Sequence, residues 1–230
     1  DYRITDVWAE PPGVSDQYFS EALLHLPRSL WCYRPAQHLP DVNVLPALSK
    51  GHVNFGSFNA FSKVDADTIA LWSRVLSAVP HSRLTLAAVA EGSVHAAMMR
   101  EFAVHGVSAE QLIVLPKMAI DAFFENLANI DIALDPIAVT GATTTCEVLW
   151  MGIPVITLAG KRFLQRAGVS TLSAAGLPQF IARSPEEYVQ IAEKWSEDLP
   201  KLAKLRAGLR DQLQASPLMD EAGFTRELEV

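Results

Sequence analysis

Three consecutive threonines and a glutamate are the residues of this chain best suited to hold a phosphorylated ligand. Thr143, Thr144 and Thr145 follow Gly141 and open a helical pattern that carries Glu147 close to its start. Backbone N–H groups at a helix start are unpaired and the helix dipole is positive there, so phosphate is attracted. Glu147 would face the same way and accept the hydroxyl groups of a ribose. The segment therefore predicts a pyrophosphate-and-ribose site for a nucleotide-activated sugar.

The same residues allow a second interpretation that needs no ligand. Thr144 and Glu147 have the spacing of a capping box, in which two side chains satisfy the free N–H groups of a helix. Such a cap stabilises a helix by about 0.5–2 kcal/mol. Spacing alone favours neither interpretation, and a capped helix can still present N–H groups to an anion.

An asparagine and a lysine follow an apolar strand pattern earlier in the chain. In the segment FNAFSKVD, Asn59 and Lys63 come directly after the predicted strand 53–58. A single ammonium there could neutralise the charge that develops on a leaving diphosphate, which is a transition-state role. Taken alone, a lone lysine is more often solvated, and an asparagine often only shapes a turn. Lys63 is the candidate catalytic residue and Asn59 a candidate donor-binding residue.

Other familiar motifs are absent or have a simpler explanation. Asp65 and Asp67 form the D-x-D pattern with which some sugar transferases chelate a metal, but the pattern precedes a helical run, where aspartates act as caps. The sequence favours the cap, and no metal site is predicted. Six histidines are scattered without ligand spacing. There is no G-x-G-x-x-G and no complete P-loop, which argues against a dehydrogenase or an NTPase.

From about residue 52 onward, short apolar strands alternate with helical patterns, and this alternation positions the candidates. It is typical of βαβ units with a parallel sheet and right-handed crossovers, in which ligands bind beyond the carboxyl ends of the strands. We expect a doubly wound, parallel, Rossmann-like α/β domain over residues 51–230, with the loops 59–63, 116–120, 135–141 and 159–162 on one rim. The predicted strands are 53–58, 83–89, 111–115, 132–134, 154–158 and 179–182, and the predicted helices 67–79, 93–105, 121–129, one from Thr143, 163–175, 185–197, 201–215 and 223–228.

Residues 1–50 have a different character because six prolines interrupt them. We expect an irregular extension there, with one helical stretch near residues 15–26. The first residue is Asp1 rather than a methionine, so we also expect the chain to be a fragment of a longer protein.

Bulk composition excludes several classes of protein. The 230 residues are 50% hydrophobic, and the net charge is −7, so a nucleic-acid-binding surface is not expected. No apolar run approaches the ~18 residues of a membrane span, and no signal peptide is visible. Cys32 and Cys146 show neither metal spacing nor a disulfide framework, which favours a cytoplasmic location.

Three segments carry a resemblance to a known family. FNAFSKVD, GATTTCEVLWMGIPVITLAG and VSTLSAAGLPQFIARSPEEYVQIA occur in this order, and with them the chain resembles the C-terminal catalytic lobe of the O-GlcNAc transferase and SPINDLY-like glycosyltransferases of family 41. The opening DYRITD…QYFSEALLHLP resembles the stretch that joins the two catalytic lobes of that family. The similarity covers nearly all 230 residues.

The resemblance implies a GT-B architecture of two Rossmann-like lobes, with the nucleotide-sugar donor bound mainly by the C-terminal lobe. It implies metal-independent, inverting transfer of a sugar to Ser or Thr hydroxyls of a protein acceptor, with tetratricopeptide repeats and an N-terminal catalytic lobe elsewhere in the protein. Residues 1–50 would be the inter-lobe segment. By position, Lys63 matches the essential lysine at the diphosphate, Thr143 and Thr144 match phosphate-binding threonines, and Glu147 matches the acidic residue on the ribose.

Several positions depart from the O-GlcNAc transferases. Ala60 and Ala142 replace a glutamine and a histidine, and Ile120, Phe123 and Asn126 stand where animal enzymes have Lys, His and Arg around the uridine. The TTTCE sequence is closer to SPINDLY-like members, some of which transfer fucose from GDP-fucose. We therefore expect a protein O-glycosyltransferase that uses UDP-GlcNAc, and keep open a GDP-fucose donor or a non-catalytic nucleotide-binding or scaffolding module.

Overall fold

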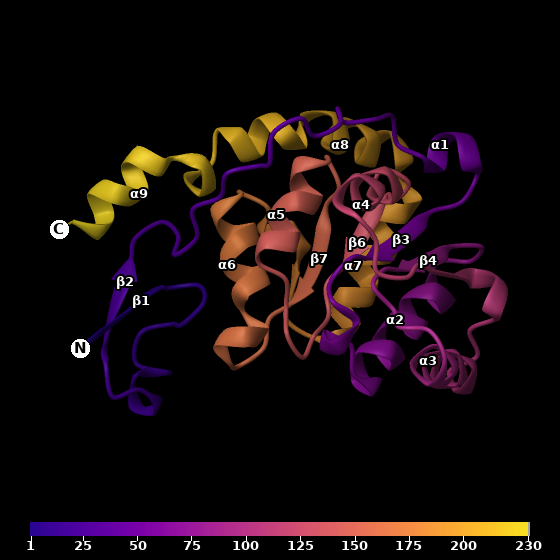
Figure 1. The fold of residues 1–230 in the computed structure, drawn as a ribbon, viewed down its shortest axis with the longest axis horizontal. Coiled ribbons are helices and arrows are strands. Elements are labelled where there is room, and N and C mark those ends of the chain that lie inside the picture. The colour runs from indigo at the N-terminus through magenta and orange to yellow at the C-terminus, as the bar shows by residue number, and fades with distance from the viewer. Residues whose placement is uncertain (230) are drawn as a thin grey trace.

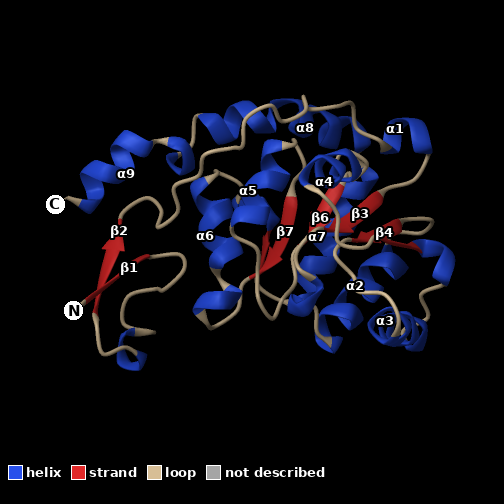
Figure 2. Cartoon of the chain, viewed as in Figure 1, coloured by secondary structure: helices blue, strands red, loops and turns tan. Residues whose placement is uncertain are grey.

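The computed structural model describes residues 1–229, and its centre is a six-stranded parallel sheet with helices on both sides (Figures 1 and 2). The predicted doubly wound parallel α/β fold is confirmed. The strand order is β5-β4-β3-β6-β7-β8. The strands are β3 (Asn54–Ser57), β4 (Arg83–Leu86), β5 (Leu112–Val114), β6 (Ile132–Leu134), β7 (Val155–Leu158) and β8 (Ile181–Ala182).

The strand order places a topological switch point between β3 and β6. From β3 the chain proceeds outward through β4 to β5, then returns to β6 on the other side of β3 and proceeds to β7 and β8. Phe55 lies opposite both Leu84 and Ile132, so β3 has a parallel neighbour on each side. The loops that follow β3 and β6 diverge at this point, which is where open α/β sheets bind ligands.

Helices cover the two faces of the sheet. Helix α2 packs against α3 and α7 on one side, and α5 packs against α6 and α8 on the other (Figure 1). The helices are α1 (Ala47–Lys50), α2 (Ala66–Ala78), α3 (Ser93–Val104), α4 (Ile120–Leu127), α5 (Thr143–Trp150), α6 (Ala167–Ala174), α7 (Pro185–Glu197), α8 (Leu199–Gln214) and α9 (Glu221–Leu228). None of the helices within residues 1–229 is both long enough and apolar enough to cross a bilayer.

Helix α2 shows how local sequence produces these elements. The Asp65 carboxylate accepts the backbone N–H of Thr68 at 2.9 Å, which caps the helix and confirms the capping interpretation of the D-x-D pattern. Ile69, Trp72 and Val75 recur at helical spacing and are buried against the sheet. The indole N–H of Trp72 has a partner in the core, because it donates to the hydroxyl of Tyr188 on α7 at 3.3 Å.

The helical stretch predicted near residues 15–26 is wrong. Only a short 3-10 turn, Asp16–Tyr18, forms there, and Ala22–Leu26 is strand β2, paired in parallel with β1 (Tyr2–Asp6). A short run with leucines at positions 23, 24 and 26 fits a helix or a strand equally well, and the partner that decides lies about 20 residues away in the chain. The helix predicted over residues 163–175 is likewise divided into a 3-10 turn, Phe163–Gln165, and α6.

A buried aspartate ties the N-terminal segment to the sheet domain. Asp6 accepts backbone N–H groups from Trp8, Ala9 and Leu30, and also the hydroxyl of Ser170 on α6. These contacts fix the end of β1 against the larger domain, because a buried carboxylate is stable only where donors surround it.

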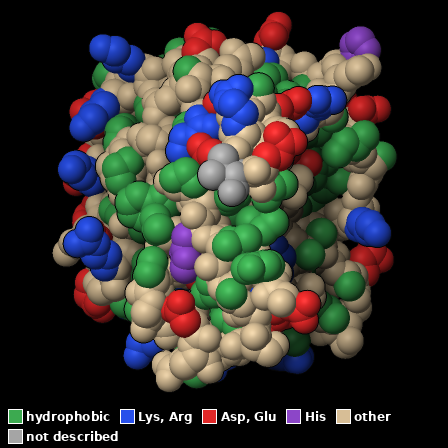
Figure 3. Space-filling model, turned by 90° about the vertical axis from the view of Figure 1, so that its left-hand side faces the viewer, with side chains coloured by type: hydrophobic (Ala, Val, Ile, Leu, Met, Phe, Trp, Pro, Cys, Tyr) green, Lys and Arg blue, Asp and Glu red, His purple; other side chains and the backbone are tan. Residues whose placement is uncertain are grey.

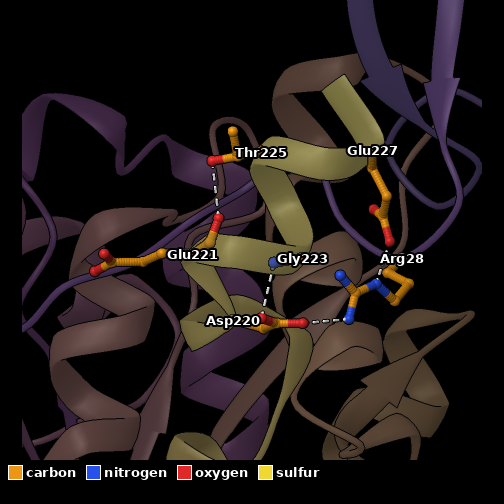
Figure 4. A network of polar contacts seen from close by, with 6 residues as sticks. All are labelled: Arg28, Asp220, Glu221, Gly223, Thr225 and Glu227. Carbon is orange, nitrogen blue, oxygen red and sulfur yellow. Dashed lines mark hydrogen bonds and ion pairs between the residues drawn. The ribbon is translucent and has the colours of Figure 1, made fainter. Parts of the chain in front are cut away.

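Helix α9 also holds the N-terminal segment, through ion pairs with its arginines (Figure 4). Arg28 donates to Asp220 at 2.8 Å and also to Glu227, and Arg34 forms a two-point contact with Glu221. The segment that follows β2 therefore lies beside α9, as their positions in Figure 1 show.

Candidate functional site

The predicted site residues lie at the carboxyl edge of the sheet, on both sides of the switch point. Asn59 and Lys63 follow β3, and the loop of residues 135–141 follows β6 and leads into α5. Hydrogen bonds connect the two loops directly, because Asn59 reaches Asp135 and Lys63 reaches Thr140. The sequence prediction that these segments share one rim is confirmed.

Lys63 spans the gap between the two loops. It ends a 3-10 turn, Phe61–Lys63, and its half-buried side chain points toward the loop before α5. Its Nζ donates to Asn59 Oδ1 at 3.2 Å and to the backbone carbonyl of Thr140 at 3.3 Å. The structure thus places the ammonium group of Lys63, the predicted catalytic residue, next to the loop that leads into α5.

Helix α5 begins at Thr143 with an uncapped amino end. Ala142 is the N-cap residue, and no side chain accepts a hydrogen bond at this cap. The capping-box interpretation of Thr144 and Glu147 is therefore wrong, because the helix starts at Thr143 and Thr144 already lies inside it. Thr143 is exposed and Thr144 is half-buried. An uncapped helix start with exposed hydroxyl groups is suited to bind an anion.

Gly141 and Thr145 pack against each other beneath Thr143 and Thr144. Thr145 is buried, and a Cβ atom on Gly141 would lie 2.5 Å from its Oγ1 and 3.2 Å from Asn59 Oδ1. Only glycine allows the loop to approach this closely. Thr145 therefore supports the loop from inside, whereas Thr143 and Thr144 are accessible.

Glu147 lies one turn further along α5, in a less polar environment. Its side chain is half-buried, and burial raises the pKa of its carboxyl group. Tyr33, from the N-terminal segment, lies near Glu147. Burial raises the pKa of its phenol, and the charge of Glu147 raises it further. Glu147 is thus held near the site in a position where a ribose hydroxyl could donate to it.

Asp135 belongs to this site, although the sequence interpretation did not assign it a role. It follows β6 directly and is fully buried. Its carboxylate accepts the N–H of Gly141 at 2.7 Å, the hydroxyl of Thr157 at 2.8 Å and the amide of Asn59 at 3.4 Å. Burial raises the pKa of Asp135 to about 7, although these hydrogen bonds and the charge of Lys63 oppose the rise. Its place at the carboxyl end of a buried strand is the signal that could have identified it.

Residues near the site have other structural roles. Arg166 donates to the carbonyls of Trp8 and Gly160, so it joins the N-terminal segment to the loop after β7. The side chain of Asn126 donates within its own helix, to the carbonyl of Ala122. Phe123 packs edge-on against Phe58, with ring centroids 5.3 Å apart. Among the described residues, no group of three or more His, Cys, Asp or Glu side chains is arranged to hold a metal ion.

Comparison with known sequences finds relatives along the whole chain. The model of glycosyl transferase family 41 matches residues 43–228. The chain is 38% identical to a Solanum lycopersicum protein named probable UDP-N-acetylglucosamine--peptide N-acetylglucosaminyltransferase SPINDLY, in an alignment that covers 100% of this chain and 25% of that protein. An Arabidopsis thaliana protein of the same name is 36% identical, again over 100% of this chain and 25% of the relative. The chain spans about a quarter of the length of these curated relatives.

Solved structures show the same similarity. A mutant of the Thermobaculum terrenum O-GlcNAc transferase superposes with a TM-score of 0.91 and 36% identity, over 100% of this chain and 44% of that one. A sucrose-phosphate synthase from Thermosynechococcus elongatus superposes with a TM-score of 0.64 and 12% identity, over 100% of this chain and 57% of that one. The second similarity shows a shared fold only.

Proposed function

Because the chain belongs to glycosyl transferase family 41, we propose that it is the donor-binding lobe of a protein O-glycosyltransferase. The donor is a nucleotide diphosphate sugar, and the acceptor is a Ser or Thr hydroxyl of a protein. The observation that carries the proposal is the placement of Lys63, whose Nζ bonds to Asn59 and to the carbonyl of Thr140, two residues before the N-cap of α5.

Transfer would proceed by direct displacement at the anomeric carbon of the sugar. The acceptor oxygen forms a bond to that carbon while the bond to the diphosphate breaks, and the diphosphate leaves with the electron pair. Lys63 and the free N–H groups of α5 stabilise the negative charge that grows on the leaving group. The hydroxyl proton leaves to a group outside this lobe. No metal ion has a part in this proposal, since an ammonium and a helix dipole supply the positive charge.

The remaining site residues would bind the donor before the reaction. Thr143 and Thr144 present accessible hydroxyls at the start of α5, and Glu147 accepts from the ribose. Three other donor-binding candidates lie beneath these hydroxyls and shape the loop of residues 135–141, on which the phosphates would rest. They are Asn59, Gly141 and Thr145.

We propose GlcNAc from UDP-GlcNAc as the transferred sugar, in agreement with the names of the relatives. A GDP-fucose donor is the second candidate, because three positions differ from those around the uridine of the animal enzymes. Ile120 and Phe123 cannot form ionic contacts, and the Asn126 amide is engaged within α4. The cations that surround uridine in the animal enzymes therefore have no counterpart at these three positions.

We also propose that residues 1–50 join this lobe to a second one. Strands β1 and β2 form a sheet of only two parallel strands, whereas parallel sheets are normally covered on both faces. Tyr2, Ile4 and Leu24 are 72%, 44% and 46% exposed and lie on one face of this pair. Figure 3 looks onto this side of the molecule, where hydrophobic side chains gather at the surface. A second lobe that extends this sheet would cover them.

The test of the proposed function is to replace Lys63 in the full-length protein that contains this chain. Lys63→Ala should lower nucleoside diphosphate release from the bound donor, in the presence of Ser/Thr peptides, by at least about 10²–10³-fold. The matched control is Lys204→Ala, at an exposed lysine on α8, which should leave the rate unchanged.

Calorimetric titration with UDP, GDP, UDP-GlcNAc and GDP-fucose identifies the donor and tests the alternative of a scaffolding module. A transferase binds one nucleotide and its sugar derivative, whereas a scaffold binds none of the four. Wild-type turnover that survives Lys63→Ala would refute the role of the lysine.

A further inference from the structure

Asp135 lies between the two halves of the candidate site and contacts both. Its Oδ1 accepts the N–H of Gly141, in the loop before α5, and the side-chain amide of Asn59, in the loop after β3 that carries Lys63. Its Oδ2 accepts the hydroxyl of Thr157 on β7. One carboxylate thus links three segments that follow or form neighbouring strands.

The charges on either side of Asn59 determine how its amide is oriented. A carboxylate only accepts hydrogen bonds, and an ammonium only donates them. The amide nitrogen must therefore face Asp135, at 3.4 Å, and the amide oxygen must face Lys63, at 3.2 Å. An amide turned the other way would point its N–H groups at the ammonium and repel it.

We propose that Asp135 is a positioning residue for sugar transfer, which directs Lys63 through Asn59 and fixes the amino end of α5 through Gly141. The inference rests on the proposed function, because it assumes that Lys63 acts on the leaving diphosphate. Asp135 has no solvent exposure, so it acts through these neighbours and does not contact the substrate.

The core holds Asp135 in place from behind. Its backbone carbonyl accepts the hydroxyl of Tyr188 at 3.2 Å, and that hydroxyl accepts the indole N–H of Trp72. Both aromatic residues are fully buried, on α7 and α2. The carboxylate is therefore supported by the two helices packed on one face of the sheet, and a rigid support is what a positioning group requires.

Stability alone does not explain a carboxylate at this position. A buried carboxylate is costly even with three donors, because burial disfavours the ionised form, and this raises its pKa to about 7. Asparagine has nearly the same shape and could keep all three contacts. Its oxygen would accept from Gly141 and Asn59, and its nitrogen would donate to Thr157, whose hydroxyl can accept as well as donate. What only the aspartate supplies is negative charge facing Lys63.

The first experiment is Asp135→Asn in the full-length enzyme. We expect kcat for nucleoside diphosphate release to fall about 10- to 100-fold, while KM for the donor changes by less than the fall in kcat and the midpoint of thermal unfolding at pH 7.5 does not decrease. The matched control is Asp131→Asn, at the other end of β6. It should lower the midpoint and leave kcat unchanged.

A double-mutant cycle tests whether Asp135 acts through Asn59. Asn59→Ala should lower kcat to a similar extent, and the double variant Asn59→Ala/Asp135→Asn should be no slower than the slower single variant. Two independent effects would instead multiply.

The outcomes separate this inference from the proposed function. An active wild-type enzyme whose Asp135→Asn variant stays within twofold of the wild-type kcat overturns the inference alone. So does a loss of kcat that matches an equal loss of folded protein, or a double variant whose defects multiply. A wild-type enzyme that releases no nucleoside diphosphate from any donor overturns the proposed function, and the inference with it.

Discussion

Two buried aspartates lie at the two ends of strand β6, and their partners differ. Asp131, before the strand, accepts backbone N–H groups from Ala47 and Asn54, both at 2.8 Å. Asp135, after the strand, accepts one backbone N–H, one amide and one hydroxyl. Burial raises the pKa of both carboxyl groups. The residues have the same type and burial, but they lie at opposite edges of one sheet.

The difference in partners separates a structural role from a functional one. A backbone N–H can only donate, and each oxygen of Asp131 accepts one. An asparagine at position 131 would therefore place its side-chain N–H groups against the backbone N–H of Ala47 or Asn54. A hydroxyl can reverse its role, so an asparagine at position 135 can be accommodated. At the amino edge of the sheet, the stability of the fold therefore requires the aspartate at position 131. At the carboxyl edge, the chain keeps a charge that its fold does not require.

Gly141→Ala is expected to have the largest effect on the carboxyl edge. The added Cβ would lie 2.5 Å from Thr145 Oγ1, so the loop, the start of α5 and Asn59 must shift. We expect the transfer rate to fall more than about 100-fold, since misplacement of about 1 Å costs that much. In Gly208→Ala, on α8, the Cβ meets nothing within 4 Å, so this control should keep its rate and gain about 0.5–1 kcal/mol of stability. Equal rates in the two variants would contradict the site geometry.

Arg206→Leu is the corresponding change at the amino edge. Arg206 is buried on α8 and donates to the carbonyls of Asn43, Ile130 and Ala128. Burial lowers its pKa to about 10, so the guanidinium stays charged at neutral pH. Its removal leaves buried carbonyls unpaired, and the free energy of unfolding should fall by about 3 kcal/mol, as measured by urea denaturation. The kcat of the folded enzyme should not change; a selective loss of kcat would remove the distinction between the two edges.

The pH dependence of stability isolates the charge on Asp135. The unfolded chain loses this proton near the ordinary value of 3.8 and the folded chain near about 7, so the folded state binds more protons between these values. Stability from this group is therefore full below pH 3.8 and is lost as the pH rises toward 7. Lys63 and Tyr188 are the titratable groups that face Asp135. Both are present in the wild type and in Asp135→Asn, so the difference between the two proteins reports the titration of Asp135. The free energy of unfolding of the wild type, relative to Asp135→Asn, should fall between pH 4.5 and pH 7; parallel curves would contradict the assignment.

The smallest effect is expected at a third aspartate, which lies two residues after Lys63 and caps helix α2. Asp65 accepts from the backbone and the hydroxyl of Thr68, so Asp65→Ala should cost about 1 kcal/mol of helix stability. Its transfer rate should match the wild type, with or without EDTA. A loss of rate that added Mg²⁺ or Mn²⁺ restores would revive the metal-chelating interpretation of the D-x-D pattern.

The sequence alone was enough for the elements whose signals are local. Alternating apolar and helical periods predicted the parallel sheet, because burial on both faces imposes apolar strands and a period of 3.6 on the helices between them. The start of α5 at Thr143 and the position of Lys63 after β3 followed from the same pattern and from the rule that ligands bind at the carboxyl edge.

Other features depended on residues that are far apart in the sequence. The pairing of β2 with β1 replaced a predicted helix. The packing of buried Thr145 under Gly141 separated it from exposed Thr143 and half-buried Thr144. The sequence places Asp131 before the apolar strand and Asp135 after it, but it does not show which groups the two carboxylates meet. Only the tertiary structure decided that one meets backbone donors and the other faces Lys63, because hydrogen-bond partners from β3, β7 and the loop before α5 come together only when the sheet is assembled.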